Sequence, residues 1–502
     1  MEIMLSSTDA EKDSYPQSNG TSEAVSPYKT VDLVELAKEL DINPKKLLWK
    51  IDIRLVPMLC ILYLMAFLDR VNISNAALFN LRGDLKIEDG NKYNTALTIF
   101  FVPYILAEVP ANIFMKKLRP HVWLSLCMFL FGLVTCLQGL VQNYQGLLAT
   151  RFFLGLCEAG MFPGCFYLIA MWYVRSEAQT RYSFFFSSTT LAGAFGGLLA
   201  SAIGKLDGHR GYSGWRWIFI IEGAVTCVLA CCLFFLIVDF PEDATFLSHN
   251  EQVYVRAKLA NDVGNSQNEY KTTFRDVLNV FKDYKVYCAG FMYFGLIIPS
   301  YGYAYFAPTI IRQFGYDNIQ TQLRSVPPWV AACGGSMIAA LASDYLQHRF
   351  AFAVTLCTIA IAGFGILLGE HHNIHVQYAG LFLCVLGLYS AMPIVICWTT
   401  TNFGGHTRRG VGTAFQVGFG NIGGIIATFS FLSKDAPRYT KGYSLGVAFA
   451  AFSILACTVY AVGISIENRN RNKGLKLEKW DSMTEEEKAK AGDKSPYYRY
   501  QM

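Results

Sequence analysis

The sequence predicts an all-α membrane protein with twelve transmembrane helices arranged as two six-helix halves. Three observations lead to this prediction. Hydrophobic residues make up 53% of the 502 residues and charged residues only 16%, whereas soluble domains average about 25% charged residues. Twelve apolar runs reach the length of about 20 residues that a membrane helix needs. A polar stretch from Asp239 to Lys282 separates the first six runs from the last six.

The first part of the chain contains a tail and six predicted spans. Residues 1–42 are polar and acidic and lack the apolar core of a cleavable signal peptide, so we expect a disordered cytoplasmic tail. The next segment, NPKKLLWKIDIR, has one apolar face, as in a helix that lies on a membrane surface; this face holds Leu47, Leu48, Ile51 and Leu55. The N-terminal bundle covers residues 43–238, with spans predicted at 52–75, 93–115, 121–142, 146–173, 183–204 and 215–238.

A linker, a second bundle and a second tail complete the chain. Residues 239–284 are charge-rich and helix-forming in composition, and we expect a cytoplasmic linker. Residues 467–502 contain runs of Glu and Lys and are expected to form a mobile cytoplasmic tail. Lys and Arg are enriched in the short loops on the side of both tails, so the positive-inside rule puts both termini in the cytoplasm. The C-terminal bundle covers residues 285–466, with spans predicted at 285–310, 325–343, 350–369, 377–400, 410–432 and 443–466.

The sequence contains few signals of chemistry outside the membrane. All 14 cysteines fall inside apolar segments, which argues against a disulfide framework or a CxxC metal motif. His371, His372 and His375 lie in a loop and are interpreted as an exposed cluster rather than a metal site. No Walker loop, nucleophile elbow or HExxH motif is present. We therefore expect no enzymatic activity, no cofactor, no metal and no nucleic-acid partner. The expected partners are a small carboxylate, protons and the lipid bilayer, and the chain is expected to act as a monomer.

Charged residues inside the predicted spans are the most informative feature of the chain. A charge in hydrocarbon costs several kcal/mol, so such residues are usually paired or face a substrate. Arg151 and Glu158 are seven residues apart and therefore share a helical face at a separation of about 10 Å. Their depths match those of Asp69 and Arg70, so the pairs Asp69–Arg151 and Arg70–Glu158 are both possible. The first half holds the charges Asp69, Arg70, Glu108, Arg151, Glu158 and Glu222.

This charge cluster has two interpretations. One is a purely structural set of ion pairs between helices. The other is a functional site, which is favoured because four embedded charges on two helices exceed a single pair. In a dry cavity Arg70 would bind a carboxylate through two hydrogen bonds, and Glu158 would then lose its partner and take up a proton.

Four further residues are candidates for weaker roles. Tyr104, in the middle of the second predicted span, would either hydrogen-bond the charge cluster or pack against it. Asn421, on a glycine-rich span, would contact the substrate or join two helices. Asp344 and Arg349 flank an inner loop and are expected to form a gate or latch. Glu108 and Glu222 are interpreted as structural residues near a membrane face or a helix end.

Several sequence strings occur together and resemble a known family. They are LDRVNISNA, RFFLGLCEAGMFPG, MWYVRSEAQTR, GWRWIFIIEG and DFPEDATFLSHNE. Together they resemble the anion:cation symporter family of the major facilitator superfamily, in particular its fungal allantoate, nicotinate and pantothenate permeases. The strings KDAPRYTKGYSLG and GDKSPYYRY are most similar to fungal nicotinate permeases. The resemblance covers approximately residues 45–470.

The resemblance implies a major facilitator fold and roles for matching positions. Asp69 and Arg70 correspond to a pair that binds substrate and couples protons. Arg151 and Glu158 correspond to the family's Arg and Glu in the fourth span, Tyr104 to a span-two tyrosine, and Asn421 to a span-eleven asparagine that contacts the substrate carboxylate. One departure concerns the loop after the second span, which carries Asn112, Lys116, Lys117 and Arg119 in place of the superfamily's Gly and Asp pattern. Only the second copy of this loop keeps its acid, Asp344.

These observations predict a proton-coupled secondary transporter that imports a small organic carboxylate, such as a nicotinate-like vitamin, by alternating access. We expect a fungal plasma-membrane permease. The alternatives are an exporter of an acidic secondary metabolite with the same fold, and a non-transporting nutrient sensor, which would be expected to carry a long structured tail. The predicted substrate-binding residues are Arg70, Tyr104 and Asn421; the predicted proton-coupling residues are Asp69, Arg151 and Glu158; the predicted gate is Asp344 with Arg349.

Overall fold

A computed structural model of the chain describes residues 32–88, 91–263, 274–404, 406–474, 480, 482–484, 493 and 495–502. Within these ranges the secondary structure is helical, without strands. Residues 1–31 of the expected N-terminal tail lie outside the described residues, as do residues 264–273 of the linker and parts of the second tail. The side chains of Lys116 and Lys117 also lie outside the described part.

The N-terminal bundle, here called the N half, consists mainly of long helices. Its first helix, α2 (Pro44–Leu78), begins at Asn43, whose side chain accepts hydrogen bonds from the backbone of Lys45 and Lys46. Pro44 occupies the first helical turn, where its missing N–H costs nothing. The other helices of the N half are α3 (Leu81–Asp84), α4 (Lys92–Lys117), α5 (Pro120–Gln138), α6 (Tyr144–Glu158), α7 (Met161–Trp172), α8 (Arg175–Ile203), η1 (Gly204–Leu206), η2 (His209–Gly211) and α9 (Gly214–Leu236).

The start of α2 differs from the expected surface helix. Leu47, Ile51 and Leu55 are 4%, 4% and 2% exposed, and Lys50 on the same helical segment pairs with Glu251 of the linker. The apolar face of NPKKLLWKIDIR therefore packs on protein rather than on lipid. Sequence periodicity identifies the apolar face, but it does not say which surface covers that face.

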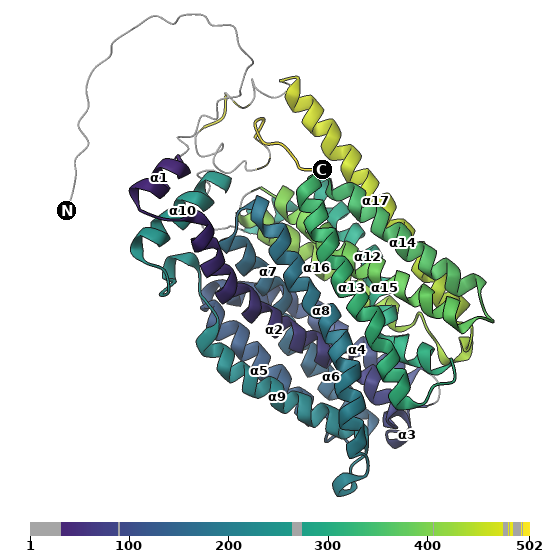
Figure 1. Ribbon diagram of the computed structural model, residues 1–502. Coiled ribbons are helices and arrows are strands. Elements are labelled where there is room, and N and C mark those ends of the chain that lie inside the picture. Colours follow the sequence, from purple (N-terminus) through teal and green to yellow (C-terminus); the bar gives the residue numbers. More distant parts are fainter. Residues whose placement is uncertain are drawn as a thin grey trace, which may run out of the picture.

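The linker and the start of the described chain form short helices at one end of the bundle. They are α1 (Leu33–Glu39), η3 (Pro241–Asp243), α10 (His249–Val263) and α11 (Phe274–Val280). α1 packs against α10, and both project from the same end of the molecule (Figure 1). Residues 33–39, which we expected to be disordered, are thus a helix. We call this end of the bundle, where α2 begins and α17 ends, the tail end.

The C-terminal bundle, here called the C half, repeats the architecture of the N half. Its helices are α12 (Tyr284–Arg312), α13 (Asn318–Leu346), α14 (Arg349–Gly369), α15 (Ile374–Asn402), α16 (His406–Thr428), η4 (Ser433–Asp435) and α17 (Thr440–Asn472). α12 contacts both α16 and α17, and α14 packs between α15 and α17.

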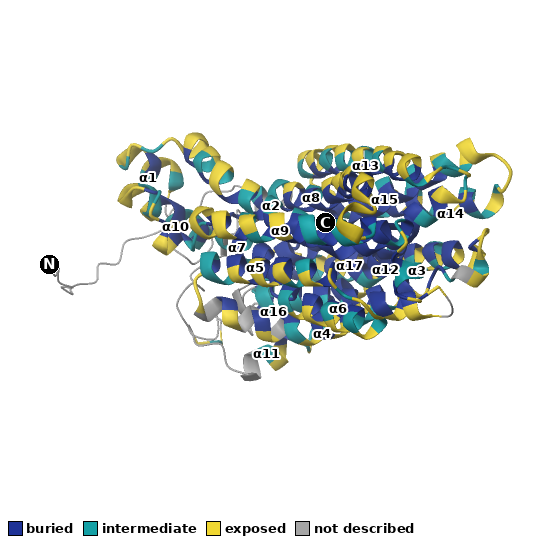
Figure 2. Cartoon of the chain, turned by 90° about the horizontal axis from the view of Figure 1, so that it is seen from below, coloured by how far each residue is buried: buried dark blue, intermediate teal, exposed yellow. Residues whose placement is uncertain are grey.

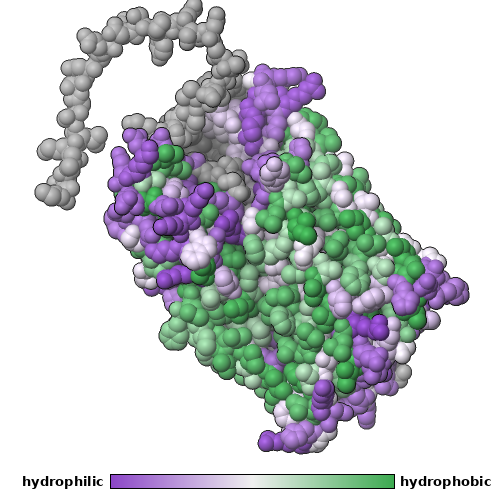
Figure 3. Space-filling view, viewed as in Figure 1, coloured by the Kyte–Doolittle hydropathy of each residue, from purple (hydrophilic) through white to green (hydrophobic). Residues whose placement is uncertain are grey.

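The surface of the molecule matches a membrane environment. Apolar side chains cover its middle, and hydrophilic residues gather at its two ends (Figure 3). Among the described residues, ten helices are long and apolar enough to cross a membrane, with α6 and α7 counted as one. The other two predicted spans correspond to α4 and α16, which have 26 and 23 residues and pack against α6 and α12. Buried residues fill the inside of the bundle (Figure 2).

The two halves meet along α8 and α13, α4 and α16, and α2 and α12. At the tail end, the Thr180 hydroxyl on α8 donates a 2.5 Å hydrogen bond to Asp344 on α13. At the opposite end, the hydroxyl oxygens of Thr98 on α4 and Thr428 on α16 are 2.6 Å apart. The halves are therefore in contact at both ends, with the middle enclosed between them.

Candidate functional site

Arg70 on α2 lies at the contact between the two halves. Its side chain is 2% exposed. One guanidinium nitrogen donates to the Glu158 carboxylate at the end of α6, and another donates to the Tyr301 hydroxyl on α12 in the C half. The guanidinium carbon also lies 4.9 Å from the ring centroids of Phe100 and Tyr104 on α4. A cation over aromatic faces is stabilised by the ring quadrupole, so Arg70 is held by a carboxylate, a hydroxyl and two rings.

Glu158 owes its position to a break in the fourth predicted span. α6 ends at Glu158, and α7 starts again at Met161. Pro163 has no N–H to donate to the Ala159 carbonyl, which favours an interruption at this point. The negative end of the α6 dipole makes a bare carboxylate unfavourable there, and Arg70 offsets that cost. The second carboxylate oxygen of Glu158 is buried and has no hydrogen-bond partner among the described residues.

A narrow cavity lies beside this charge pair, between the halves. It leaves only about 10 Å³ free for the centre of a water molecule, enough for about one water. Tyr301 belongs both to its wall and to the Arg70 contact. Helices α2, α8, α12 and α15 supply its lining residues, Tyr63, Phe67, Phe186, Thr189, Tyr293, Ile297, Ser300, Tyr301, Tyr389 and Met392.

Asp69 points away from Arg70, into the interior of the N half. It lies near the hydroxyls of Thr135 on α5 and Thr226 on α9, and the Glu222 carboxyl is a further acidic neighbour. Both carboxylate oxygens are buried without a hydrogen-bond partner among the described residues. The possible Asp69–Arg151 ion pair does not form, because consecutive residues on a helix point about 100° apart and only Arg70 faces α6. The Arg70–Glu158 pair does form.

Arg151 lies close to Arg70 and forms no ion pair with a carboxylate of the described residues. One of its guanidinium nitrogens donates a long, 3.4 Å hydrogen bond to the Arg70 carbonyl. Its Nε and Nη2 atoms are buried and have no hydrogen-bond partner within the described parts of the chain. Tyr93 and Tyr305 are close enough to interact electrostatically with this guanidinium. A buried guanidinium with free donors is costly and can accept an anion.

Among the described residues, the remaining predicted site residues form no hydrogen bond or ion pair with Arg70. Asn421 on α16 is buried and faces the Glu108 carboxyl on α4, across the contact between halves. Asp344 also bridges the halves, through Thr180. Arg349 does not pair with Asp344; its guanidinium donates to Thr401 at 2.7 Å and to Gln501 at 2.8 Å, both in the C half. The sequence spacing of Asp344 and Arg349 resembles a latch, but the two side chains serve different contacts.

The sequence analysis did not name one residue of the site, Tyr301, and placed another, Glu108, near a membrane face. Tyr301 was not singled out, although Tyr301 and Tyr305 are one helical turn apart and stack at 5.6 Å, while Tyr303 turns toward Trp329. Glu108, interpreted as a structural residue near a membrane face, is fully buried between the halves. The spacing between Tyr104 and Glu108 could have predicted this position, since residues four apart share a helical face.

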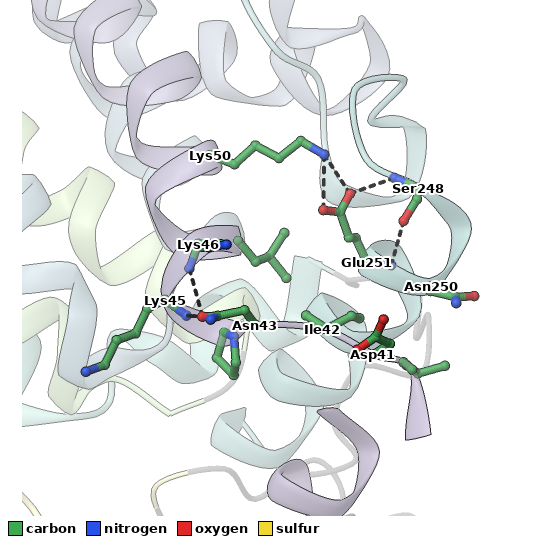
Figure 4. Close-up of a pocket in the computed structure, with 12 residues that line it drawn as sticks. Asp41, Ile42, Asn43, Lys45, Lys46, Lys50, Ser248, Asn250 and Glu251 are labelled. Carbon is green, nitrogen blue, oxygen red and sulfur yellow. Dashed lines mark hydrogen bonds and ion pairs between the residues drawn. The ribbon is translucent and has the colours of Figure 1, made fainter. Parts of the chain in front are cut away.

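A second, wider groove lies at the tail end, between the start of α2 and α10 (Figure 4). Here Lys50 pairs with Glu251 at 2.7 Å, and Glu251 also accepts a hydrogen bond from the backbone of Ser248. Partial burial raises the pKa of Glu251, but the hydrogen bonds from Lys50 and Ser248 outweigh that effect, so the pKa lies below its ordinary value. This groove lies at the start of α2, whereas Arg70 lies 20 residues beyond Lys50 on the same helix, about 30 Å away at 1.5 Å per residue. It joins the linker to α2.

Among the described residues, no group of three or more His, Cys, Asp or Glu side chains is arranged to hold a metal. The groups brought together around Arg70 are a buried guanidinium, which is the kind of group that binds anions, and the Glu158 carboxyl, which is a group that can carry a proton.

Comparisons with known proteins agree with this architecture. The MFS-type transporter cnsO of Penicillium expansum is 33% identical over 512 aligned residues, which cover 99% of this chain and 98% of the relative. The high-affinity nicotinic acid transporter of Saccharomyces cerevisiae is 29% identical over 461 residues, 91% of this chain and 84% of the relative. Among solved structures, the proton:xylose symporter XylE aligns with a TM-score of 0.61 at 14% identity, covering 80% of this chain and 94% of XylE.

Because the identity to XylE is low, the structural similarity supports only the fold. The family description "Major Facilitator Superfamily" matches residues 59–428, from the middle of α2 to the end of α16. This match spans both halves and the linker between them. The chain therefore belongs to the major facilitator superfamily and is a multi-pass membrane protein.

Proposed function

We propose that this chain is a proton-coupled transporter of the anion:cation symporter type, which imports a small organic carboxylate by alternating access. The observation that carries the proposal is the position of Arg70. Its buried guanidinium is shared between Glu158 of the N half and Tyr301 of the C half. A substrate carboxylate that binds Arg70 would therefore act on an acid and on the contact between halves at once.

A nicotinate-like aromatic monocarboxylate is the first candidate substrate. Six of the ten residues lining the central cavity are Tyr or Phe, and aromatic walls favour planar aromatic ligands. Arg70 lies beside this wall, because it donates a hydrogen bond to the wall residue Tyr301. It would bind one carboxylate through two hydrogen bonds. The relative from Saccharomyces cerevisiae that is named a nicotinic acid transporter supports the same substrate class.

Proton coupling would follow from competition for Arg70. When the substrate carboxylate takes the Arg70 hydrogen bonds, Glu158 loses its cation in a buried site. A proton from the outside solution then neutralises the Glu158 carboxylate, and its unpartnered oxygen is free to receive it. On release of the substrate to the inside, Arg70 returns to Glu158 and the proton leaves. Arg151 and Asp69 would tune this exchange by their charges, and Tyr104 would hold the Arg70 guanidinium in place.

Alternating access would require the halves to separate at one end at a time. The cavity has room for about one water, so a substrate can enter only after the contact at one end opens. Asp344 with Thr180 would act as the gate at the tail end, and Asn421 with Glu108 would join the halves near the substrate. We propose that the tail end faces the cytoplasm of a plasma-membrane carrier, following the positive-inside distribution of Lys and Arg.

Uptake of labelled nicotinate tests this function. Cells that express the chain are assayed at acidic external pH, with and without a protonophore, and the Arg70→Ala variant at equal surface amount serves as the control. We expect saturable uptake that collapses with the protonophore and is absent from the variant. Uptake that persists with the protonophore would contradict proton coupling. No uptake, combined with active efflux from preloaded cells, would indicate an exporter instead.

A further inference from the structure

The last residues of the chain, Asp493 and 495–502, are packed into the tail end of the C half. We call them the C-terminal strap. Asp493 is 0% exposed and Tyr500 4% exposed, which is unusual for residues at the end of a polar tail. We expected a mobile tail here, and for these residues the expectation was wrong.

The strap is hydrogen-bonded to α15 and α14 through backbone and side chain. The Gln501 backbone carbonyl accepts from the Trp398 indole at 2.8 Å and from the Asn402 side-chain amide at 2.9 Å. The Gln501 backbone N–H donates to the side-chain amide oxygen of Asn402 at 2.9 Å. The Arg349 backbone N–H donates to the Met502 carbonyl at 2.8 Å, and its guanidinium donates to the Gln501 side chain. These bonds hold the strap as a fixed piece of chain.

A second set of bonds connects the strap to α16 and α17. Asp493 pairs with Arg408 on α16 at 2.8 Å. Arg471 on α17 donates to the Asp493 carbonyl at 2.8 Å and to the Tyr498 carbonyl at 2.7 Å. The Tyr500 hydroxyl donates to the Asp493 carboxylate at 2.9 Å. Arg408 also pairs with Asp283, which caps the start of α12.

The strap thereby satisfies three buried cations. Arg349, Arg408 and Arg471 are 4%, 9% and 7% exposed, and each of them receives an acceptor from the strap. A buried charge that loses its partner is strongly destabilising. The strap contacts described above all end on helices of the C half, so they need not break when the two halves separate.

We propose that the C-terminal strap is a permanent brace, which holds the tail ends of α14, α15, α16 and α17 together so that the C half moves as one body. Through Arg408 and Asp283 the brace also reaches α12. This matters for the central cavity, because α12 carries Tyr301 and α16 carries Asn421. The proposal depends on the packing of the C half and not on the identity of the substrate.

Gly404 offers a test in which no residue of the strap is substituted. A Cβ atom at Gly404 would lie 2.3 Å from the Asp493 backbone nitrogen and 2.8 Å from its Cβ atom, so Gly404→Ala must displace the strap. A Cβ atom at Gly410, six residues later in α16, would meet nothing within 4 Å, so Gly410→Ala is the matched control. Asp493→Ala is the second variant, since it removes the Arg408 ion pair without adding an atom.

The reporter is Cys397 on α15, a free, fully buried thiol beside Trp398. In full-length protein with Cys397 as the only cysteine, the rate of maleimide labelling and the melting temperature are measured for the parent and each variant. We expect Gly404→Ala and Asp493→Ala to raise the labelling rate at least about tenfold, because a buried thiol reacts only after local opening, and to lower the melting temperature. Gly410→Ala should match the parent. Labelling at the parent rate in both Gly404→Ala and Asp493→Ala would overturn the proposal.

Discussion

The Arg70 guanidinium donates a hydrogen bond to the Tyr301 hydroxyl, and this bond ties the buried charge cluster of the N half to α12 of the C half. The same guanidinium pairs with Glu158. Any ligand that draws Arg70 away from these partners changes the protonation environment of Glu158 and also loosens a contact between the halves. In the proposed function, binding and conformational change would therefore share one side chain.

Removing the Tyr301 hydroxyl tests this relationship directly. Tyr301→Phe keeps the ring in the cavity wall but deletes the acceptor of the Arg70 hydrogen bond. A hydrogen bond to a charged group contributes about 1.5–3 kcal/mol. In the variant a substrate carboxylate no longer has to break this bond to bind Arg70, so we expect the KM for carboxylate uptake to fall by about tenfold or more. Concentration-dependent uptake at equal surface amount is the measurement.

Tyr303→Phe is the matched control for that variant. Tyr303 lies two residues away on α12, and its hydroxyl is buried with no hydrogen-bond partner among the described residues. Deleting a hydroxyl that has no partner should leave uptake unchanged and stability equal or slightly higher. If Tyr303→Phe lowers the KM as much as Tyr301→Phe, the effect comes from the ring environment of α12 and not from Arg70.

Glu158→Gln should separate proton coupling from substrate binding. The amide keeps the size of the side chain but carries no charge and takes up no proton. We expect proton-driven accumulation to be abolished, while exchange of labelled for unlabelled substrate continues. Arg70→Ala should abolish both activities, because the anion site is lost. Accumulation and exchange are measured for both variants in proteoliposomes with an imposed pH gradient. Normal transport by Arg70→Ala would refute the anion site.

The sequence predicted the large-scale architecture because that architecture depends on local features of the sequence. Apolar runs of about 20 residues determine spans, and the linker interrupts them once. The Arg70–Glu158 pair was one of two pairings that the sequence allowed, because embedded charges need a partner in an apolar setting. The same argument allowed Asp69–Arg151, which does not form, because matching depth does not fix the direction in which a side chain points.

The roles of Tyr301 and Arg349 were not predictable, because each depends on a residue far along the chain. Arg349 bonds Gln501, 152 positions later, and neither helical periodicity nor local spacing reports a contact of that range.

Gly193→Ala should hinder closure of the two halves. A Cβ atom at Gly193 on α8 would lie 2.4 Å from the Trp329 ring on α13, which is rigid and 4% exposed. The helices must move apart to admit the added methyl group, so we expect uptake to fall several-fold with little loss of folded protein. Gly334→Ala on α13 is the control, since a Cβ atom there would meet nothing within 4 Å. Equal uptake by both variants would show that the α8–α13 contact tolerates adjustment.

Asp69→Asn should reveal whether the inner carboxylate of the N half takes part in proton coupling. Neither of its carboxylate oxygens has a hydrogen-bond partner among the described residues, so the variant should fold with a melting temperature close to that of the parent. We expect a smaller accumulation ratio in a pH gradient, with exchange maintained. Glu222→Gln is the control, because Glu222 is also buried in the N half but lies farther from Arg70. Loss of accumulation in Glu222→Gln alone would assign the proton to Glu222.

Docking of the C-terminal strap should depend on pH through Asp493. Burial raises the pKa of this carboxyl above its ordinary value of 3.8, although Arg408, Lys285, Tyr500 and Arg471 all oppose the shift.

A raised pKa means that the docked strap binds a proton more readily than the free strap does. Its contribution to stability is therefore complete below the ordinary value and decreases as the pH rises through the docked value. In the Asp493→Asn variant this side chain is uncharged at every pH, so the variant lacks this dependence of stability on pH. We expect the melting temperature of the parent to fall relative to Asp493→Asn as the pH rises from acid, and then to level off. A relative rise of the parent would mean that the ion pair with Arg408 outweighs the cost of burying the carboxylate.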